Sequence, residues 1–421
     1  MKVLVIGNGA REHTLVWKIA RSPQVDVIFA VPGNAGTGNL ASNLDIPLND
    51  ISSIIKKARE LGIGLAVVGP EAPLAAGITD LFNQAGIPVF GPSRAAARLE
   101  SSKAFARDIM QRNNVPCAAG GTFTSYSEAK TYIETHDVPI VVKADGLAAG
   151  KGVTVAQTAD EALGALRSIM KDRAFGAAGD TVVIEECLLG KEVSLLAFSD
   201  GKNVIPMVPA CDYKRVFDGD QGPNTGGMGS YSPPGFFDQE MTLQVVKNII
   251  QPTVAAMAKD GSPYKGVLYT GLIITQQGPK VLEFNARFGD PETQVILPRL
   301  ESDLVEIMLA VLDGRLDRVK IDWSNDACVG VVMSSGGYPG NYRTDFPISI
   351  SDRLEKDVNI FYAGATKRED GNVVTSGGRV LTVTAKGRNL KEAREKVYRN
   401  IPYIDFEACH FRRDIAAREV N

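Results

Sequence analysis

A short apolar run that leads into a glycine-rich loop is the feature that most constrains this 421-residue chain. Residues 139–143 (PIVVK) are rich in β-branched side chains and predict a strand that ends at Lys143. Three glycines in the next segment, 145–153 (DGLAAGKGV), allow positive φ angles and let several backbone N–H groups point toward one anion. We expect polyphosphate there, with Lys143 and Lys151 as point charges. The loop alone also fits a solvated hairpin, since it has neither the P-loop nor the dinucleotide spacing.

A second segment, 181–195, reads as a strand, a turn at Gly190 and another strand. A chain that passes the edge of an adenine ring can offer it backbone C=O and N–H groups. We expect residues 185–188 to do this and Glu192 to accept the ribose hydroxyls. The alternative is a plain hairpin with exposed glutamates, which for Glu186 alone is the simpler interpretation.

Residues 280–287 alternate so that Glu283, Asn285 and Arg287 share one face of a predicted strand, with Leu282 and Phe284 on the other face. Hard cations such as Mg²⁺ take oxygen ligands and bridge the phosphates of a bound nucleotide. We therefore favour a metal pair made by Glu283 and Asn285, over a polar strand face that simply points to water.

Together these segments, in this order and separation, resemble the ATP-grasp superfamily, whose first lysine matches Lys103. Three stretches, 143–153, 212–229 and 285–294, resemble more narrowly the phosphoribosylamine–glycine ligase (glycinamide ribonucleotide synthetase) family. This resemblance runs from Met1 to about the C-terminus.

The expected fold is a multidomain α/β protein, because a chain of this length exceeds one ordinary core. We expect an N-terminal parallel α/β domain over residues 1–101 and an ATP-grasp domain over 102–325, with a mobile lid module at about 122–192. A mostly β domain should cover 326–421. Residues 94–111 predict a continuous helix, and 219–235 predict a long functional or disordered loop, since they lack a hydrophobic period.

By resemblance, ATP would activate the carboxylate of glycine as glycyl phosphate, and 5-phosphoribosylamine would then displace the phosphate to give glycinamide ribonucleotide in purine biosynthesis. The resemblance implies catalytic roles for Lys143 and Arg287, and Mg²⁺ or Mn²⁺ at Glu283 and Asn285. It implies ATP contacts from Lys103, Lys143, Asp145, Gly146, Gly150, Lys151, Gly152, Glu185, Glu186, Leu188 and Glu192. It implies substrate contacts from Gly9, Asn34, Glu71, Asp212, Lys214, Arg287, Asp290, Pro291 and Thr293.

The N-terminal strand, glycine turn and helix invite a dinucleotide-binding interpretation, which we reject because Glu12 stands where the third glycine is required. Three turns, 7–9, 32–36 and 69–71, still follow apolar strands and should gather at the carboxyl edge of a parallel sheet. They are either ordinary turns or, as the resemblance implies, a holder for the ribose phosphate.

Composition and charge limit the kinds of partner and compartment that this chain can have. A net charge of −3 gives no basic footprint for nucleic acid. Five cysteines without CxxC spacing predict reduced thiols and a cytoplasmic protein. No apolar run reaches the length of a membrane span. We expect a monomer that acts on small molecules.

Three alternatives remain open at this point: another ATP-grasp amine ligase, a carboxylase that uses bicarbonate, and a non-catalytic nucleotide-binding regulator. One departure from the wider superfamily concerns the metal site. Many members carry an acidic residue about a dozen positions before the glutamate of the metal pair, whereas this chain has residues 269–271 (YTG) there. The turn 377–379 (GGR) is typical of a tight turn, although it could also approach the site.

Overall fold

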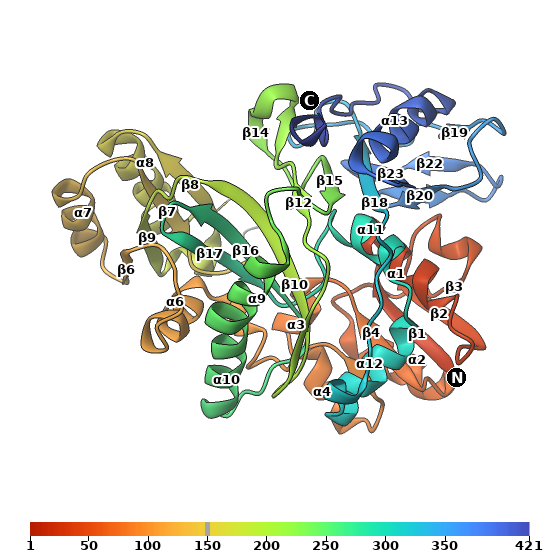
Figure 1. Ribbon diagram of the computed structural model, residues 1–421, viewed down its shortest axis with the longest axis horizontal. Coiled ribbons are helices and arrows are strands. Elements are labelled where there is room, and N and C mark those ends of the chain that lie inside the picture. The colour runs from red at the N-terminus through yellow and green to blue at the C-terminus, as the bar shows by residue number, and fades with distance from the viewer. Residues whose placement is uncertain (148–151, 421) are drawn as a thin grey trace.

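The N-terminal region is a five-stranded parallel sheet in the order β3-β2-β1-β4-β5, seen in red and orange in Figure 1. The computed structural model of the protein describes residues 1–147 and 152–420. Residues Val3 to Ile6 are fully buried, because helices cover both faces of a parallel sheet. The elements are β1 (Lys2–Gly7), α1 (Ala10–Ile19), β2 (Val27–Pro32), β3 (Ser42–Asn43), α2 (Ile51–Leu61), β4 (Leu65–Val68), α3 (Glu71–Ala75), α4 (Ile78–Gln84) and β5 (Val89–Phe90).

The strand order reverses beside β1, and the turns after β1 and β4 flank that switch point, where α/β sheets bind ligands. Glu12 fills the crevice between them. A Cβ atom on Gly7 would lie 2.4 Å from the Glu12 side chain and one on Gly69 would lie 2.0 Å from it. These glycines therefore make room for a buried carboxylate, which accepts a hydrogen bond from the Gly9 N–H at 2.6 Å.

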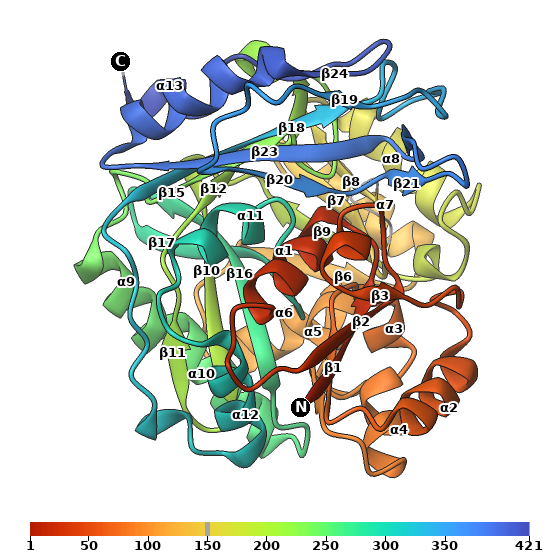
Figure 2. The same cartoon turned by 90° about the vertical axis from the view of Figure 1, so that its right-hand side faces the viewer.

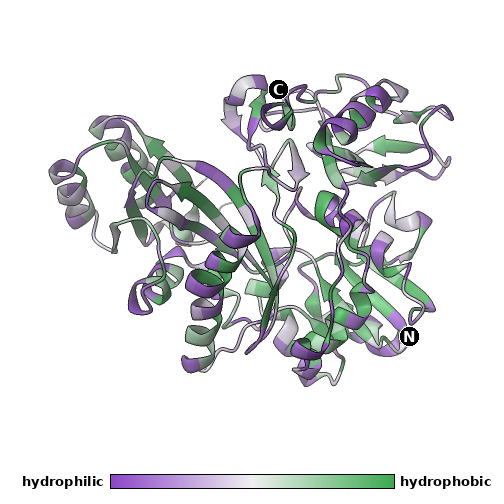
Figure 3. Ribbon diagram, viewed as in Figure 1, coloured by the Kyte–Doolittle hydropathy of each residue, from purple (hydrophilic) through white to green (hydrophobic). Residues whose placement is uncertain are grey.

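A small antiparallel module with its own core follows, in the strand order β6-β9-β7-β8. It projects to the left in Figure 1, and strand hydrophobicity marks its interior in Figure 3. Eleven buried residues, among them Ile133, Val142 and Ile184, form a cluster separate from the rest of the molecule. The elements are β6 (Gly120–Phe123), α7 (Tyr126–Thr135), β7 (Ile140–Ala144), β8 (Val153–Ala156), α8 (Ala159–Met170) and β9 (Val182–Glu186).

The central sheet is antiparallel in the order β11-β10-β16-β17, and the turn 187–190 connects it to the small module. The predicted strand, turn and strand over 181–195 is thus present. The elements of this region are α5 (Arg98–Ser101), α6 (Lys103–Arg112), β10 (Lys191–Asp200), β11 (Val204–Pro206), α9 (Gln239–Val245), α10 (Gln251–Lys259), β16 (Lys265–Thr275), β17 (Gly278–Asn285), α11 (Thr293–Ile296) and α12 (Leu304–Asp313).

The C-terminal region is built on a five-stranded antiparallel sheet, β12-β15-β18-β23-β20, that lies above the N-terminal region in Figure 2. Two of its strands, β12 (Cys211–Asp212) and β15 (Gly229–Ser232), come from the segment that precedes residue 326. The chain therefore enters the C-terminal sheet twice, first at β12 and again at β18. The remaining elements are β13 (Arg215–Phe217), β14 (Gln221–Asn224), β18 (Ala327–Ser334), β19 (Ser349–Ile350), β20 (Val358–Tyr362), β21 (Ala365–Lys367), β22 (Val373–Thr375), β23 (Arg379–Gly387), α13 (Leu390–Asn400) and β24 (Ile404–Asp405).

Two local predictions are wrong. The continuous helix over 94–111 breaks at Ser102, whose extended backbone and hydroxyl cap the N-terminus of α6 by accepting the Phe105 N–H. The segment 219–235 contains β14, which forms a local hairpin with β13, and β15, which pairs with the distant strand β18 despite the missing hydrophobic period. None of the helices in the described ranges has both the length and the apolar character needed to cross a bilayer.

His13 lies at the contact between the N-terminal and C-terminal regions. Its side chain is 6 % exposed, and its Nδ1 accepts the Tyr362 N–H at 2.9 Å. The ring also stacks against Tyr362 and meets the edge of Phe361. Burial lowers the pKa of His13 to about 4, so the ring is neutral in the folded protein at neutral pH.

The stability of the protein should fall as the pH drops from 6.5 toward 4, because the unfolded His13 binds a proton over this range and the folded one does not. We expect His13 to contribute about 2 kcal/mol of this decline between pH 7 and pH 5. Denaturant unfolding at several pH values should show a shallower decline for His13→Asn. His136→Asn, on the exposed end of α7, is the control and should keep the wild-type dependence; equal slopes for all three proteins would contradict the assignment.

Candidate active site

Lys143, at the end of β7, connects the small module to the central sheet. Its Nζ lies 2.5 Å from Glu185 Oε2 on β9 and donates to the Leu282 carbonyl on β17 at 3.2 Å. Leu282 directly precedes Glu283. The structure therefore brings the predicted phosphate lysine next to the predicted metal pair, which is 140 positions further along the chain.

The start of the glycine-rich loop is docked on the N-terminus of α6. Asp145 accepts the Ala104 N–H at 3.0 Å, a favourable place for a carboxylate at a helix N-terminus. Lys103 Nζ donates to the Gly146 carbonyl at 3.0 Å, and burial lowers the pKa of Lys103 despite the nearby Glu283 carboxylate. Gly146 has φ of 142°, and a Cβ there would lie 2.7 Å from Ala178.

The other predicted loop residues divide into two groups. The buried Gly152 continues the sheet, since its carbonyl accepts the Ala144 N–H at 2.8 Å. Gly150 and Lys151 lie outside the described residues.

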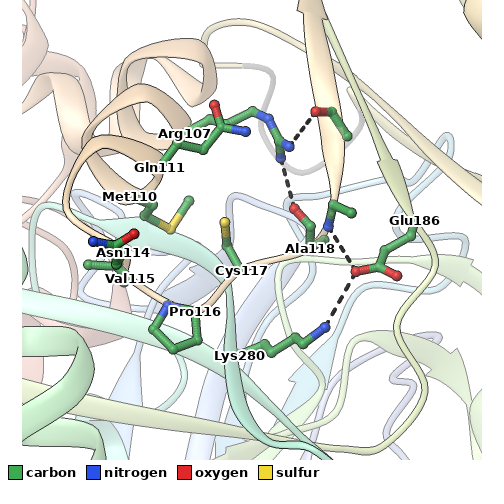
Figure 4. Close-up of a pocket in the computed structure, with 12 residues that line it drawn as sticks. Arg107, Met110, Gln111, Asn114, Val115, Pro116, Cys117, Ala118, Glu186 and Lys280 are labelled. Carbon is green, nitrogen blue, oxygen red and sulfur yellow. Dashed lines mark hydrogen bonds and ion pairs between the residues drawn. The ribbon is translucent and has the colours of Figure 1, made fainter.

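The hinge between β9 and β10 is fixed on one side, beside the pocket in Figure 4. The Glu186 N–H donates to the Ala119 carbonyl at 2.8 Å, and the Glu186 carboxylate accepts the Ala119 N–H at 2.8 Å and lies 3.4 Å from Lys280 Nζ. The N–H of Glu186 is thus engaged.

The predicted alternation along β17 fails at Leu282. A β-bulge shifts the register between β16 and β17, so Val281 is buried and Leu282 is only half-buried. From Glu283 onward the alternation holds: Glu283 is exposed, Phe284 is buried and Asn285 is half-buried.

The donor set at Glu283 and Asn285 fits a hard divalent cation. Glu283 is exposed, and over residues 1–147 and 152–420 its carboxylate makes no hydrogen bond or ion pair, so its oxygens are open to a ligand. The same residues hold no group of three or more His, Cys, Asp or Glu side chains arranged for a metal. A cation here would take its remaining ligands from phosphate and water.

Arg287 is held between two carboxylates from the N-terminal side of the site. Its Nε lies 3.2 Å from Glu71, and its terminal nitrogen lies 2.9 Å from Glu100 and 3.4 Å from Asn285 Oδ1. Glu100 also accepts the Ala286 N–H at 2.7 Å. Burial would raise the pKa of Glu71, but the charges of Arg287 and Arg11 and the hydrogen bonds to its carboxylate together lower that pKa. For Glu100, burial dominates and raises the pKa. No spacing pattern pointed to Glu100.

Lys214 lies among the carboxylates of Asp212, Glu192 and Glu283. Lys214 Nζ lies 2.6 Å from Glu192, so the residue predicted for ribose is paired here with one predicted for substrate. Burial raises the pKa of Asp212 against the opposing effect of Lys214, and the carboxylates of Glu292 and Glu192 raise it further. Glu292 is buried and accepts a hydrogen bond from the Tyr269 hydroxyl at 3.0 Å. Tyr269 thus holds the Glu292 carboxylate beside the site. The local sequence around Tyr269 does not indicate this contact.

Asp290 anchors the C-terminal region to the site. It lies 2.9 Å from Arg379, which also donates to the Gly226 carbonyl at 2.5 Å, so the 377–379 turn does reach the site. Pro291 accepts a hydrogen bond from Ser230 and packs where a Cβ on Gly227 would stand. The remaining predicted residue here, Thr293, is buried and donates to the Gly289 carbonyl at 2.6 Å.

Asn34 joins the N-terminal turns to the C-terminal region. Its amide donates to the carbonyls of Asn8, Gly9 and Tyr362 at 2.9, 3.2 and 2.7 Å. Its carbonyl oxygen accepts two backbone N–H groups. The side chain is therefore occupied by the fold. Gly9 faces Asp290, since a Cβ on Gly9 would lie 3.5 Å from Asp290 Oδ2.

The site therefore has two poles of charge. Lys103, Lys143 and Arg287 make up the cationic pole, and Asp212, Glu192, Glu283 and Glu292 make up the acidic pole. A small module that sets Lys143 against a sheet carrying Glu283 and Asn285 is the arrangement of ATP-grasp enzymes, and the fold defines this class.

Comparison with known proteins agrees with this class and narrows it. Family models match the phosphoribosylglycinamide synthetase N domain at residues 1–100, the ATP-grasp (A) domain at 101–293 and the C domain at 328–418. A phosphoribosylamine–glycine ligase of Halalkalibacterium halodurans is 49 % identical over 420 residues, which is all of this chain and 97 % of the relative. The chain belongs to the phosphoribosylglycinamide synthetase family.

Solved structures agree. The crystal structure of a phosphoribosylamine–glycine ligase from Thermotoga maritima has a TM-score of 0.87 and 32 % identity, and the match covers 99 % of this chain and 100 % of that one. The biotin carboxylase domain of a Hydrogenobacter thermophilus 2-oxoglutarate carboxylase has a TM-score of 0.75 at 17 % identity, over 97 % and 91 % of the two chains, and shares the fold. The predicted family, its α/β fold and its assignment as an ATP-dependent ligase are confirmed.

Removing the charge of Arg379 should cost stability, because Asp290 would be left largely buried without its partner. We expect Arg379→Gln to lower the free energy of unfolding by about 3 kcal/mol. Denaturant unfolding followed by circular dichroism measures this. Arg388→Gln removes an arginine that pairs with Glu392 in water, and should leave stability unchanged. Equal effects of the two substitutions would show that the Asp290 contact does not hold the C-terminal region.

Proposed function

We propose that this protein ligates glycine to 5-phosphoribosylamine, with conversion of ATP to ADP and phosphate, and forms glycinamide ribonucleotide for purine biosynthesis. Curated relatives that match the whole chain carry the name phosphoribosylamine–glycine ligase. A carboxylate is a poor acyl donor because its leaving group would be oxide. It must therefore first become a mixed anhydride.

The reaction then has two balanced steps. A carboxylate oxygen of glycine attacks the γ-phosphorus of ATP, the bond to the bridging oxygen breaks, and ADP leaves with that electron pair. The amine of phosphoribosylamine next attacks the acyl carbon of glycyl phosphate, loses a proton as the amide forms, and expels phosphate. Neither step needs a protein nucleophile, so the task of the chain is positioning and charge neutralisation.

The cationic pole supports the first step. Lys143 and Lys103, with the loop from Asp145 to Gly152, would contact phosphate oxygens. Arg287 offers a planar fork of donors that suits the glycine carboxylate or the phosphoryl group in transit. A bound Mg²⁺ or Mn²⁺ would neutralise phosphate charge, held by Glu283 and Asn285.

The nucleoside and acceptor subsites complete the assignment. The hinge at Glu185 to Leu188 would meet the adenine and Glu192 the ribose, after exchange of its contact with Lys214. The acidic pole suits the ammonium group of glycine, for which Asp212 is the candidate. The crevice at Gly9, Asn34 and Glu71, together with the Asp290–Thr293 segment, would hold the phosphoribosyl group.

The observation that carries the proposal is the contact of Lys143 with Leu282, beside Glu283. This contact holds the small module against the strand that carries Glu283 and Asn285. A regulator that only binds a nucleotide would not need such a contact. The separate core of that module supports a lid that opens as a unit. Five free thiols are typical of a reducing compartment, so we expect a cytoplasmic enzyme. We also expect the enzyme to act as a monomer.

Purified protein should release ADP from ATP and Mg²⁺ only when glycine and freshly made phosphoribosylamine are both present. A coupled ADP assay with glycine, alanine or bicarbonate offered in turn measures this. Requirement for glycine and the amine supports the ligase. Release with bicarbonate would instead indicate a carboxylase, and no release with any acid would indicate a regulator.

Glu283→Gln should abolish turnover, because a neutral amide binds a divalent cation far more weakly than a carboxylate does. Nucleotide binding should remain measurable, since the hinge and the lysines are intact. Steady-state kinetics and calorimetric titration with ADP separate the two effects. Glu301→Gln, an exposed change outside the site, is the control. Full activity of Glu283→Gln would disprove the metal assignment.

A further inference from the structure

Arg107 lies behind the nucleotide site, on the same helix as Lys103, and its side chain is 3 % exposed. One terminal nitrogen donates to Glu185 Oε1 at 2.8 Å and to the Ala118 carbonyl at 3.1 Å. The other donates to the Gly120 carbonyl at 2.6 Å. Figure 4 shows that the Arg107 guanidinium reaches from α6 toward residues 118–120, where β6 begins. Local sequence patterns give no reason for a buried arginine at this position.

Two cations share the single carboxylate of Glu185. Arg107 binds Oε1, and Lys143 lies 2.5 Å from Oε2. The Glu185 side chain is 9 % exposed and that of Lys143 is 12 % exposed, so water does little to screen either contact. Removing one partner of a simple buried ion pair leaves an uncompensated charge, which is strongly unfavourable. A carboxylate with two cationic partners avoids this problem.

We propose that Arg107 is a positioning residue that frees Lys143 for the nucleotide. Arg107 stays with Glu185 as a permanent partner, so Lys143 can turn from Glu185 to a phosphate oxygen without leaving a buried carboxylate unpaired. The inference rests on the proposed role of Lys143 in phosphate binding. Arg107 would thus control the affinity for ATP through Glu185 and Lys143, without contacting ATP itself.

The net charge of Arg107, Glu185 and Lys143 predicts the order of the ATP affinities of the variants. The trio of Arg107, Glu185 and Lys143 carries one net positive charge. Arg107→Met reduces it to zero and leaves Lys143 as the only partner of Glu185, so the Kd for ATP should rise about tenfold. Glu185→Gln removes the competing carboxylate and should lower the Kd. The double variant restores one net positive charge and should bring the Kd back near the wild-type value.

The experiment is calorimetric titration of each variant with ATP and Mg²⁺ in the absence of glycine, together with the KM for ATP and kcat. Arg107→Met should raise the KM for ATP more than it lowers kcat. Arg107→Lys keeps the charge and should bind ATP nearly as the wild type does, which keeps the test usable if Arg107→Met folds poorly. Arg112→Met, on the exposed face of the same helix, is the matched control and should leave the Kd unchanged.

The outcomes separate the two levels of inference. If Lys143→Met binds ATP as the wild type does, the proposed role of Lys143 is wrong. If Lys143→Met loses affinity while Arg107→Met does not, the positioning role of Arg107 is wrong. If the double variant binds as weakly as Arg107→Met alone, Arg107 acts only by holding residues 118–120, and the proposal is overturned. Recovery of affinity in the double variant supports it.

Discussion

The ion pairs of Arg287 with Glu71 and Glu100 are the interaction on which the arrangement of the site depends. A largely buried guanidinium needs anionic partners, and here they come from the N-terminal region and from the short helix that follows it. Since Arg287 is two residues beyond Asn285, these contacts fix the end of β17, which carries Glu283 and Asn285, against the crevice of the N-terminal region. The distance between the two halves of the site is therefore set by buried charge.

The C-terminal region completes this enclosure with the same kind of contact. Arg379 reaches Asp290, and Asn34 and His13 connect the N-terminal turns to the backbone of Tyr362. The small module is attached differently. It has a core of its own and contacts the central sheet through Lys143 and the ends of its strands. This division suits an enzyme that must admit ATP and then exclude water.

Local sequence was informative wherever function needs backbone freedom or alternating side chains. The strand before the glycine-rich loop, the hinge between β9 and β10 and the face shared by Glu283 and Asn285 could all be predicted. The bulge at Leu282 could not, because it depends on the pairing with β16, whereas the break at Ser102 is a local N-cap that the helical pattern of residues 94–111 obscured. Glu100 and Arg107 were missed because each acts on a residue more than 75 positions away.

The sequence by itself determined the chemical parts: a lysine at a strand end, glycines that permit a tight loop, and oxygen ligands spaced two apart. These follow from the geometry of single strands and turns, which neighbouring residues control. Only the tertiary structure decided which charges meet. Lys143 faces Glu185, Lys214 faces Glu192 and Arg287 lies between two glutamates, because burial forces ionised groups to find partners wherever the fold brings them.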